Sequence, residues 1–132
     1  MPLRADTENW IAWAEYDLET ARHMLATGRY LYVVFCCHIA LEKLLKAHVT
    51  EVTQAVPPKT HDLLFLVQLI GLALPQPYQD FLGKINNASI VARYPGDLQK
   101  TVGTYSQALT RTYLTQTEEI CNWLKKHPNL QT

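Results

Sequence analysis

Residues 30–50 form the most apolar part of the chain, and their pattern predicts a central helix. One face recurs at intervals of three and four residues, which is helical spacing. That face comprises Val34, Cys37, Leu41, Leu44, Leu45 and His48. The remaining circumference is filled mostly by Phe35, Cys36, Ile39 and Ala40. A helix that is apolar nearly all round is normally surrounded by other helices, so this segment should be the core of a bundle.

The segments on either side predict further helices. Before the central helix, Asp6 or Thr7 can cap a first helix, which Gly28 can end in the left-handed conformation that glycine adopts easily. We therefore expect this first helix to run antiparallel to the central helix and to pack against it.

The second half of the chain predicts three helices. Thr60 can cap a short apolar helix over residues 61–73, and helical spacing predicts a longer helix over residues 78–91. A capping box over Thr104–Gln107 starts the last helix, which Pro128 closes. The expected fold class is all-α, an up-and-down antiparallel bundle of four long helices plus one short helix, with residues 1–132 in a single domain.

Composition narrows the functional classes. With 12 basic and 12 acidic residues the chain has no overall basic field, so any phosphate site must be local. Three cysteines, two of them adjacent, offer neither a disulfide framework nor a metal-ligand spacing, so we expect buried thiols and no metal or cofactor. The first residues lack an apolar signal region and no stretch reaches membrane-spanning length, so we expect a cytoplasmic protein without a membrane association.

The polar residues of the central helix form one stripe. His38, Glu42 and Lys46 are spaced four residues apart, with Lys43 beside them. One interpretation makes Lys43 or Lys46 a phosphate ligand that Glu42 positions. The other is a solvated or subunit-facing ion pair, weak in an exposed helix. In the first helix Asp17 lies among apolar neighbours, and we expect it to pair with a lysine of the central helix or to lie at the edge of the stripe.

Three stretches together resemble the HEPN family of small helical proteins. They are the segment 13–21, the segment 35–47 leading to Pro58-Lys-Thr-His-Asp-Leu63, and Ala92-Arg-Tyr-Pro95. The resemblance covers about residues 10–125. It implies a helical bundle that commonly forms a homodimer, often paired with a minimal nucleotidyltransferase in a toxin–antitoxin-like system.

The wider superfamily includes metal-independent ribonucleases whose motif is an arginine followed, after four to six residues, by a histidine. The best-placed arginine here is Arg93, and no histidine follows it at that distance. We therefore expect a binding module in place of a nuclease, because no general base or acid for the ribose 2′-hydroxyl is evident.

Two further segments carry candidate ligands for a nucleotide or RNA phosphate. Arg93 offers a planar donor fork, and the adjacent Tyr94 can stack on a base; alternatively, Arg93 bridges helix four to a carboxylate of the core. Lys59 and His61 flank a helix start, where Thr60 and Asp62 provide a simple capping alternative.

The expected site therefore comprises Arg93, Tyr94, Lys43, Lys46, His38, Glu42, Lys59 and His61. Trp10, Trp13 and Trp123 are expected to be core or dimer-face aromatics. Two alternatives stay open: a ribonuclease with a degenerate motif that uses Arg93 and a histidine such as His38 or His61 from elsewhere, and a dimeric scaffold that binds no ligand.

Overall fold

The computed structural model describes residues 2–93 and 96–132, with side chains for 2–90 and 96–132. These residues form six α-helices and a terminal 3₁₀ turn, and no strand occurs among them. The all-α prediction is confirmed. The elements are α1 Ala5–Ala26, α2 Tyr30–Thr53, α3 Leu63–Leu69, α4 Gln76–Arg93, α5 Leu98–Thr104, α6 Gln107–Lys126 and η1 Pro128–Leu130.

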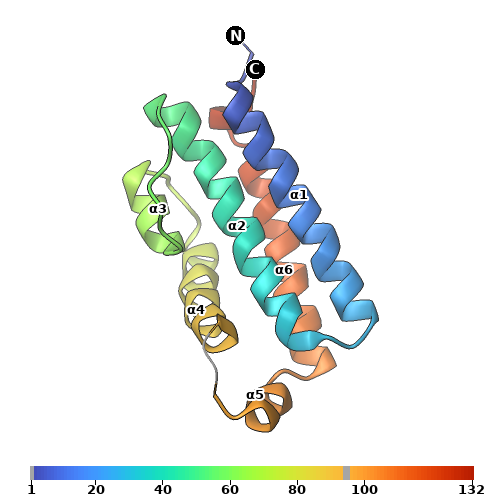
Figure 1. The fold of residues 1–132 in the computed structure, drawn as a ribbon. Helices are drawn as coiled ribbons and strands as arrows, with labels where there is room; N and C mark the ends of the chain where they lie inside the picture. The colour runs from blue at the N-terminus through green and yellow to red at the C-terminus, as the bar shows by residue number, and fades with distance from the viewer. Residues whose placement is uncertain (1, 94–95) are drawn as a thin grey trace.

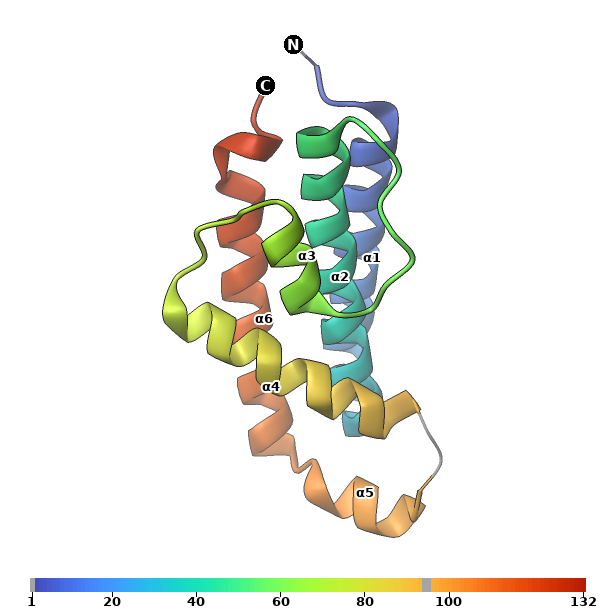
Figure 2. The same cartoon turned by 90° about the vertical axis from the view of Figure 1, so that its left-hand side faces the viewer.

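The long helices α1, α2 and α6 run side by side, and both chain ends lie at the same end of the bundle (Figure 1). Seen from the side, α4 crosses α2 and α6 obliquely, α3 lies against α2, and α5 lies at the end away from the termini (Figure 2). The architecture therefore places α2 between α1 on one side and α3 and α4 on the other.

The apolar surround of α2 explains this arrangement. Most of its side chains are buried in one cluster with residues of α1, α3, α4 and α6. Leu41, Leu45 and Leu82 are completely buried in this cluster. Over the described residues, none of the helices has the length and hydropathy needed to cross a membrane.

Some predicted helix starts are wrong by a few residues. α1 begins at Ala5, so Asp6 and Thr7 lie in its first turn, and the Thr7 hydroxyl instead meets the Thr50 hydroxyl of α2 at 2.6 Å. Asp62 and not Thr60 caps α3, because its carboxylate accepts the backbone N–H of Leu64. At the other end of α1, Gly28 has φ +80°, which confirms the predicted left-handed residue.

The last helix also starts later than predicted. Ser106 caps α6 by accepting the N–H of Leu109, whereas Thr104 ends α5. The expected capping box over Thr104–Gln107 is therefore wrong. α5 itself was not predicted; none of its residues is buried, so it lacks the apolar periodicity that identifies a helix.

Candidate functional site

A buried carboxylate organises the polar residues of α2. The Glu42 side chain is 8% exposed, and its two oxygens are bound by different side chains. Lys46 donates to one oxygen at 3.1 Å from the next turn of α2, and His61 Nδ1 lies 2.8 Å from the other. The pair predicted from the i, i+4 spacing is confirmed, but it is buried and not solvated, because α3 and the loop before it cover this side of α2.

His61 combines a fixed position with an exposed ring. Its side chain is 66% exposed although Nδ1 is bound to Glu42. No other described residue hydrogen-bonds to Nε2, so this nitrogen is available to a ligand. A histidine oriented through one nitrogen by a carboxylate can bind an anion or transfer a proton with the other.

A second set of hydrogen bonds fixes the loop that carries His61. Asn86 of α4 accepts the N–H of Leu63 at 3.2 Å and donates to Asp62 at 3.0 Å. His38 Nε2 lies 3.2 Å from the same Asn86 oxygen, and since that oxygen can only accept, His38 is the donor. His38 is completely buried, so its role here is to position Asn86 and not to meet a ligand in solvent. We call these six residues the Glu42 cluster: His38, Glu42, Lys46, His61, Asp62 and Asn86.

Lys43 contacts α1, which lies on the other side of α2 from α3. Its ammonium group donates to Asp17 of α1 at 2.5 Å, as predicted for the isolated carboxylate of the first helix. The same ammonium lies 4.6 Å from the centre of the Trp13 ring. The polar stripe is therefore divided: Lys43 fastens α1, and Glu42 meets the loop before α3. Lys46 lies between Glu42 and the Trp10 ring of α1.

The tryptophans near Lys43 line a hollow that the sequence did not indicate. A cavity of about 190 Å³ is bordered by Asn9, Trp10, Trp13 and Lys43, and we call it the tryptophan hollow. Trp10 is half-buried against the core, but Trp13 is 49% exposed. We expected Trp10 and Trp13 to be core or dimer-face aromatics, and that expectation did not include an open hollow between the two rings.

The other expected site residues lie in the loop between α2 and α3 and at the end of α4. Lys59 is exposed in the loop between α2 and α3. Arg93 is the last residue of α4, but its side chain and the whole of Tyr94 and Pro95 lie outside the described residues. The structure therefore brings together Glu42, Lys46, His61 and His38, whereas Lys43 faces α1.

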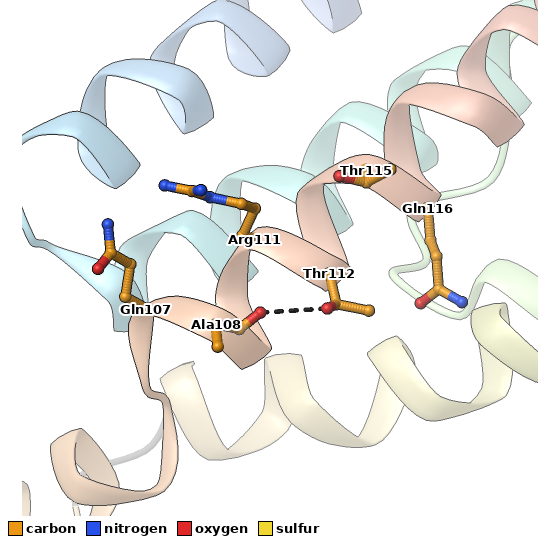
Figure 3. A pocket seen from close by; sticks show the side chains of 6 residues that line it. All are labelled: Gln107, Ala108, Arg111, Thr112, Thr115 and Gln116. Carbon is orange, nitrogen blue, oxygen red and sulfur yellow. Dashed lines mark hydrogen bonds between the residues drawn. The ribbon is translucent and has the colours of Figure 1, made fainter.

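A larger hollow lies elsewhere, along the outer surface of α6. Its volume is about 490 Å³, and Figure 3 shows its lining side chains, which come from α6 alone. The Thr112 hydroxyl donates a hydrogen bond to the Ala108 carbonyl. Arg111 is the one charged side chain of the lining. The residues are Gln107, Ala108, Arg111, Thr112, Thr115 and Gln116. The hollow shares no residue with the Glu42 cluster and carries no arrangement of acid and base.

The cysteines are free and buried, as the composition indicated. Burial raises the pKa of Cys37 to about 12 and also raises the pKa of Cys121. Their thiols therefore stay protonated at neutral pH and are poor nucleophiles. Among the described residues, no group of three or more His, Cys, Asp or Glu side chains is arranged to hold a metal ion.

Comparison with known proteins agrees with the sequence resemblance. The HEPN domain family model matches residues 7–127. TT1696 from Thermus thermophilus has a similar structure, with a TM-score of 0.79 and 17% identity over 93% of this chain and 98% of that one. ST0689, described as an archaeal HEPN homologue, gives a TM-score of 0.65 and 23% identity over 90% of this chain and 94% of its own. No curated protein matches the chain.

Proposed function

The chain belongs to the HEPN domain family, and on this premise we propose that it is a cytoplasmic module that binds the phosphate of a nucleotide or RNA. The observation that carries the proposal is His61, whose imidazole is largely exposed yet held in place by the buried Glu42. A ring fixed in this way loses little freedom when it binds a ligand.

The other members of the expected site have distinct parts in this proposal. Lys59 and His61 contact the phosphate directly, because both are exposed in the α2–α3 loop. In this proposal Arg93 supplies a guanidinium fork and Tyr94 supplies a stacking ring. The buried residues Lys46, Glu42 and His38 fix the loop that carries Lys59 and His61. Lys43 contributes from the α1 side of α2.

The start of α3 does not compete for the anion. One oxygen of Asp62 already accepts the N–H groups of Leu64 and Phe65 and the amide of Asn86. These donors disperse the negative charge of Asp62, and they also occupy the helix end. Phosphate binding therefore depends on the side chains of Lys59, His61 and Arg93.

The proposed partners follow from family membership. We propose that the chain forms a homodimer and works with a minimal nucleotidyltransferase in a toxin–antitoxin-like pair. A neighbouring reading frame with the Gly-Ser and paired-acid motif of a nucleotidyltransferase would support this assignment. Size-exclusion chromatography with light scattering tests the homodimer.

The binding proposal is tested by thermal-shift titration with a panel of nucleotides and a short RNA. A ligand at one hundred times its Kd stabilises the folded state by about 2.7 kcal/mol, which raises Tm by roughly 5 °C or more in a domain of this size. We expect a shift in the wild type that is lost in His61→Ala and Arg93→Ala. Lys126→Ala, which removes an exposed cation at the end of α6, is the matched control and should respond as the wild type does. If no ligand shifts the wild type, the isolated chain has no useful nucleotide site, which leaves a site completed by a partner or the dimeric scaffold that binds no ligand.

The same histidine favours a second candidate function, metal-independent ribonuclease activity. Nε2 of His61 takes the proton of a ribose 2′-hydroxyl, and the 2′-oxygen bonds to the adjacent phosphorus. The bond from phosphorus to the 5′-oxygen breaks, and that oxygen takes a proton from water. The products are a 2′,3′-cyclic phosphate and a 5′-hydroxyl end. RNA cleavage in a chelator that disappears in His61→Ala but not in Lys126→Ala would establish this function, and intact RNA would remove it.

A further inference from the structure

Trp13 of α1 is an aromatic residue whose ring is about half exposed to solvent. Trp13 is 49% exposed in the middle of α1 and Tyr16 is 65% exposed, so these two rings form a contiguous aromatic surface. Trp13 is also part of the tryptophan hollow, together with Asn9, Trp10 and Lys43.

The Trp13 ring is held although it is exposed. Lys43 lies 4.6 Å from the ring centre, and Tyr16 meets the ring edge-on with centres 5.9 Å apart. The ion pair with Asp17 holds Lys43 itself in place. An aromatic surface that is fixed before binding loses little entropy when a flat ring stacks on it.

Lys46 joins the tryptophan hollow to the Glu42 cluster. Its ammonium lies 5.7 Å from the Trp10 ring centre and donates to Glu42, which in turn binds His61. Lys46 therefore lies between the Trp10 ring on the α1 side of α2 and Glu42, the carboxylate that holds His61.

We propose that the tryptophan hollow is a nucleobase site, which receives the base of a nucleotide or RNA whose phosphate binds at Lys59 and His61. This inference rests on the proposed function and extends it from phosphate to base. Indole rings stack on the π-face of any base, so the hollow binds bases with little preference among them. The exposed Asn9 amide, which offers both a donor and an acceptor, supplies a hydrogen bond to the base edge.

The chemistry of the hollow favours a base over an apolar partner surface. An apolar partner surface on these residues would cover the exposed Asn9 amide without giving it a hydrogen-bond partner, which is costly. A base instead provides both a ring to stack and polar edges to pair.

The test compares AMP with ribose 5-phosphate by calorimetric titration at one salt concentration. Base stacking should make AMP bind the wild type at least about fivefold more tightly than ribose 5-phosphate. Trp13→Leu should abolish this difference without changing the affinity for ribose 5-phosphate, and Trp13→Phe should restore part of it. Tyr32→Leu, which removes an exposed aromatic ring of α2 outside the hollow, is the matched control and should bind both ligands as the wild type does.

Each result separates the nucleobase site from the proposed phosphate site. His61→Ala should weaken both ligands, so equal weakening by Trp13→Leu would overturn the nucleobase site and leave the phosphate site standing. A Trp13→Leu protein that changes its oligomeric state but not its AMP affinity would make the hollow a subunit interface. If neither phosphate binds the wild type, adenosine binding that Trp13→Leu removes would support the nucleobase site alone, and no adenosine binding would overturn both.

Discussion

His48 should make the stability of the fold depend on pH. It is completely buried on α2, where Nε2 lies 2.9 Å from the Leu124 carbonyl of α6 and Nδ1 lies 3.3 Å from the Asn129 amide of η1. A carbonyl oxygen can only accept, so Nε2 carries the proton and Nδ1 accepts from Asn129. Both nitrogens are therefore satisfied in the neutral ring, which fastens the end of α6 to the core.

Protonation of His48 would place a charge in this buried position. Burial, with His127 nearby, lowers the pKa of His48 from 6.5 to about 4, against the opposing effect of the Leu124 hydrogen bond. Between these two values the unfolded chain binds a proton that the folded chain does not, so the free energy of unfolding falls as the pH falls. The full loss between pH 6.5 and pH 4 is about 3 kcal/mol, of which about 2 kcal/mol is lost by pH 5.

Urea unfolding at a series of pH values measures this loss, and His48→Gln isolates it. Glutamine can donate to Leu124 and accept from Asn129 without titrating, so the variant keeps the contacts but not the pH dependence of this residue. The other four histidines are present in both proteins. We expect the wild type to lose about 2 kcal/mol more than the variant between pH 7 and pH 5. Parallel losses in the two proteins would refute the assignment of this pH dependence to His48.

Three further predictions follow from the helix cap, the core and the cysteines. Asp62→Ala should lower the free energy of unfolding in urea by about 1 to 2 kcal/mol, because the variant loses the cap of α3; an unchanged midpoint would contradict the assigned cap. Leu82→Ala should cost about 2 to 5 kcal/mol, since Leu82 is completely buried, whereas Leu98→Ala on the surface of α5 should change stability by less than about 0.5 kcal/mol; equal effects would mean that the core is wrongly placed. Cys37 and Cys121 should react with a thiol reagent at pH 8 only after unfolding, because burial raises the pKa of both thiols; rapid labelling of the native protein would show that they are accessible.

The sequence predicted those helices that bury a continuous face. Helices α1, α2, α4 and α6 carry apolar side chains at helical spacing, and the sequence contains this spacing directly. Helix α5 has no buried face, so its sequence resembles a polar loop. The start of α3 was wrong because Thr60 and Asp62 are both suitable caps, and only the folded backbone decides which side chain reaches the free N–H groups.

The candidate site was predicted only where its contacts are local or chemically forced. The Glu42–Lys46 pair follows from a separation of one helical turn. Asp17 lies among apolar neighbours, so a lysine of the central helix was one of its two expected surroundings, and Lys43 is that partner. Asn86 was missed because it meets His38 and Leu63 from another helix, and no local pattern marks such a residue. The tryptophan hollow was missed for the same reason, since it forms only where α1 and α2 pack together.

The buried charges of α2 add little to the stability of the core. Removing Glu42 and Lys46 from water costs free energy that their mutual attraction and the His61 contact only offset, and well-packed apolar residues often serve a core equally well. Most of the other buried side chains of α2 are apolar, whereas Glu42 and Lys46 lie in one polar stripe with His38. Glu42 holds the exposed His61 ring through Nδ1, and the Lys46 ammonium lies 5.7 Å from the centre of the Trp10 ring. In the proposed function, these two charges hold His61 in the orientation that leaves Nε2 to meet a phosphate.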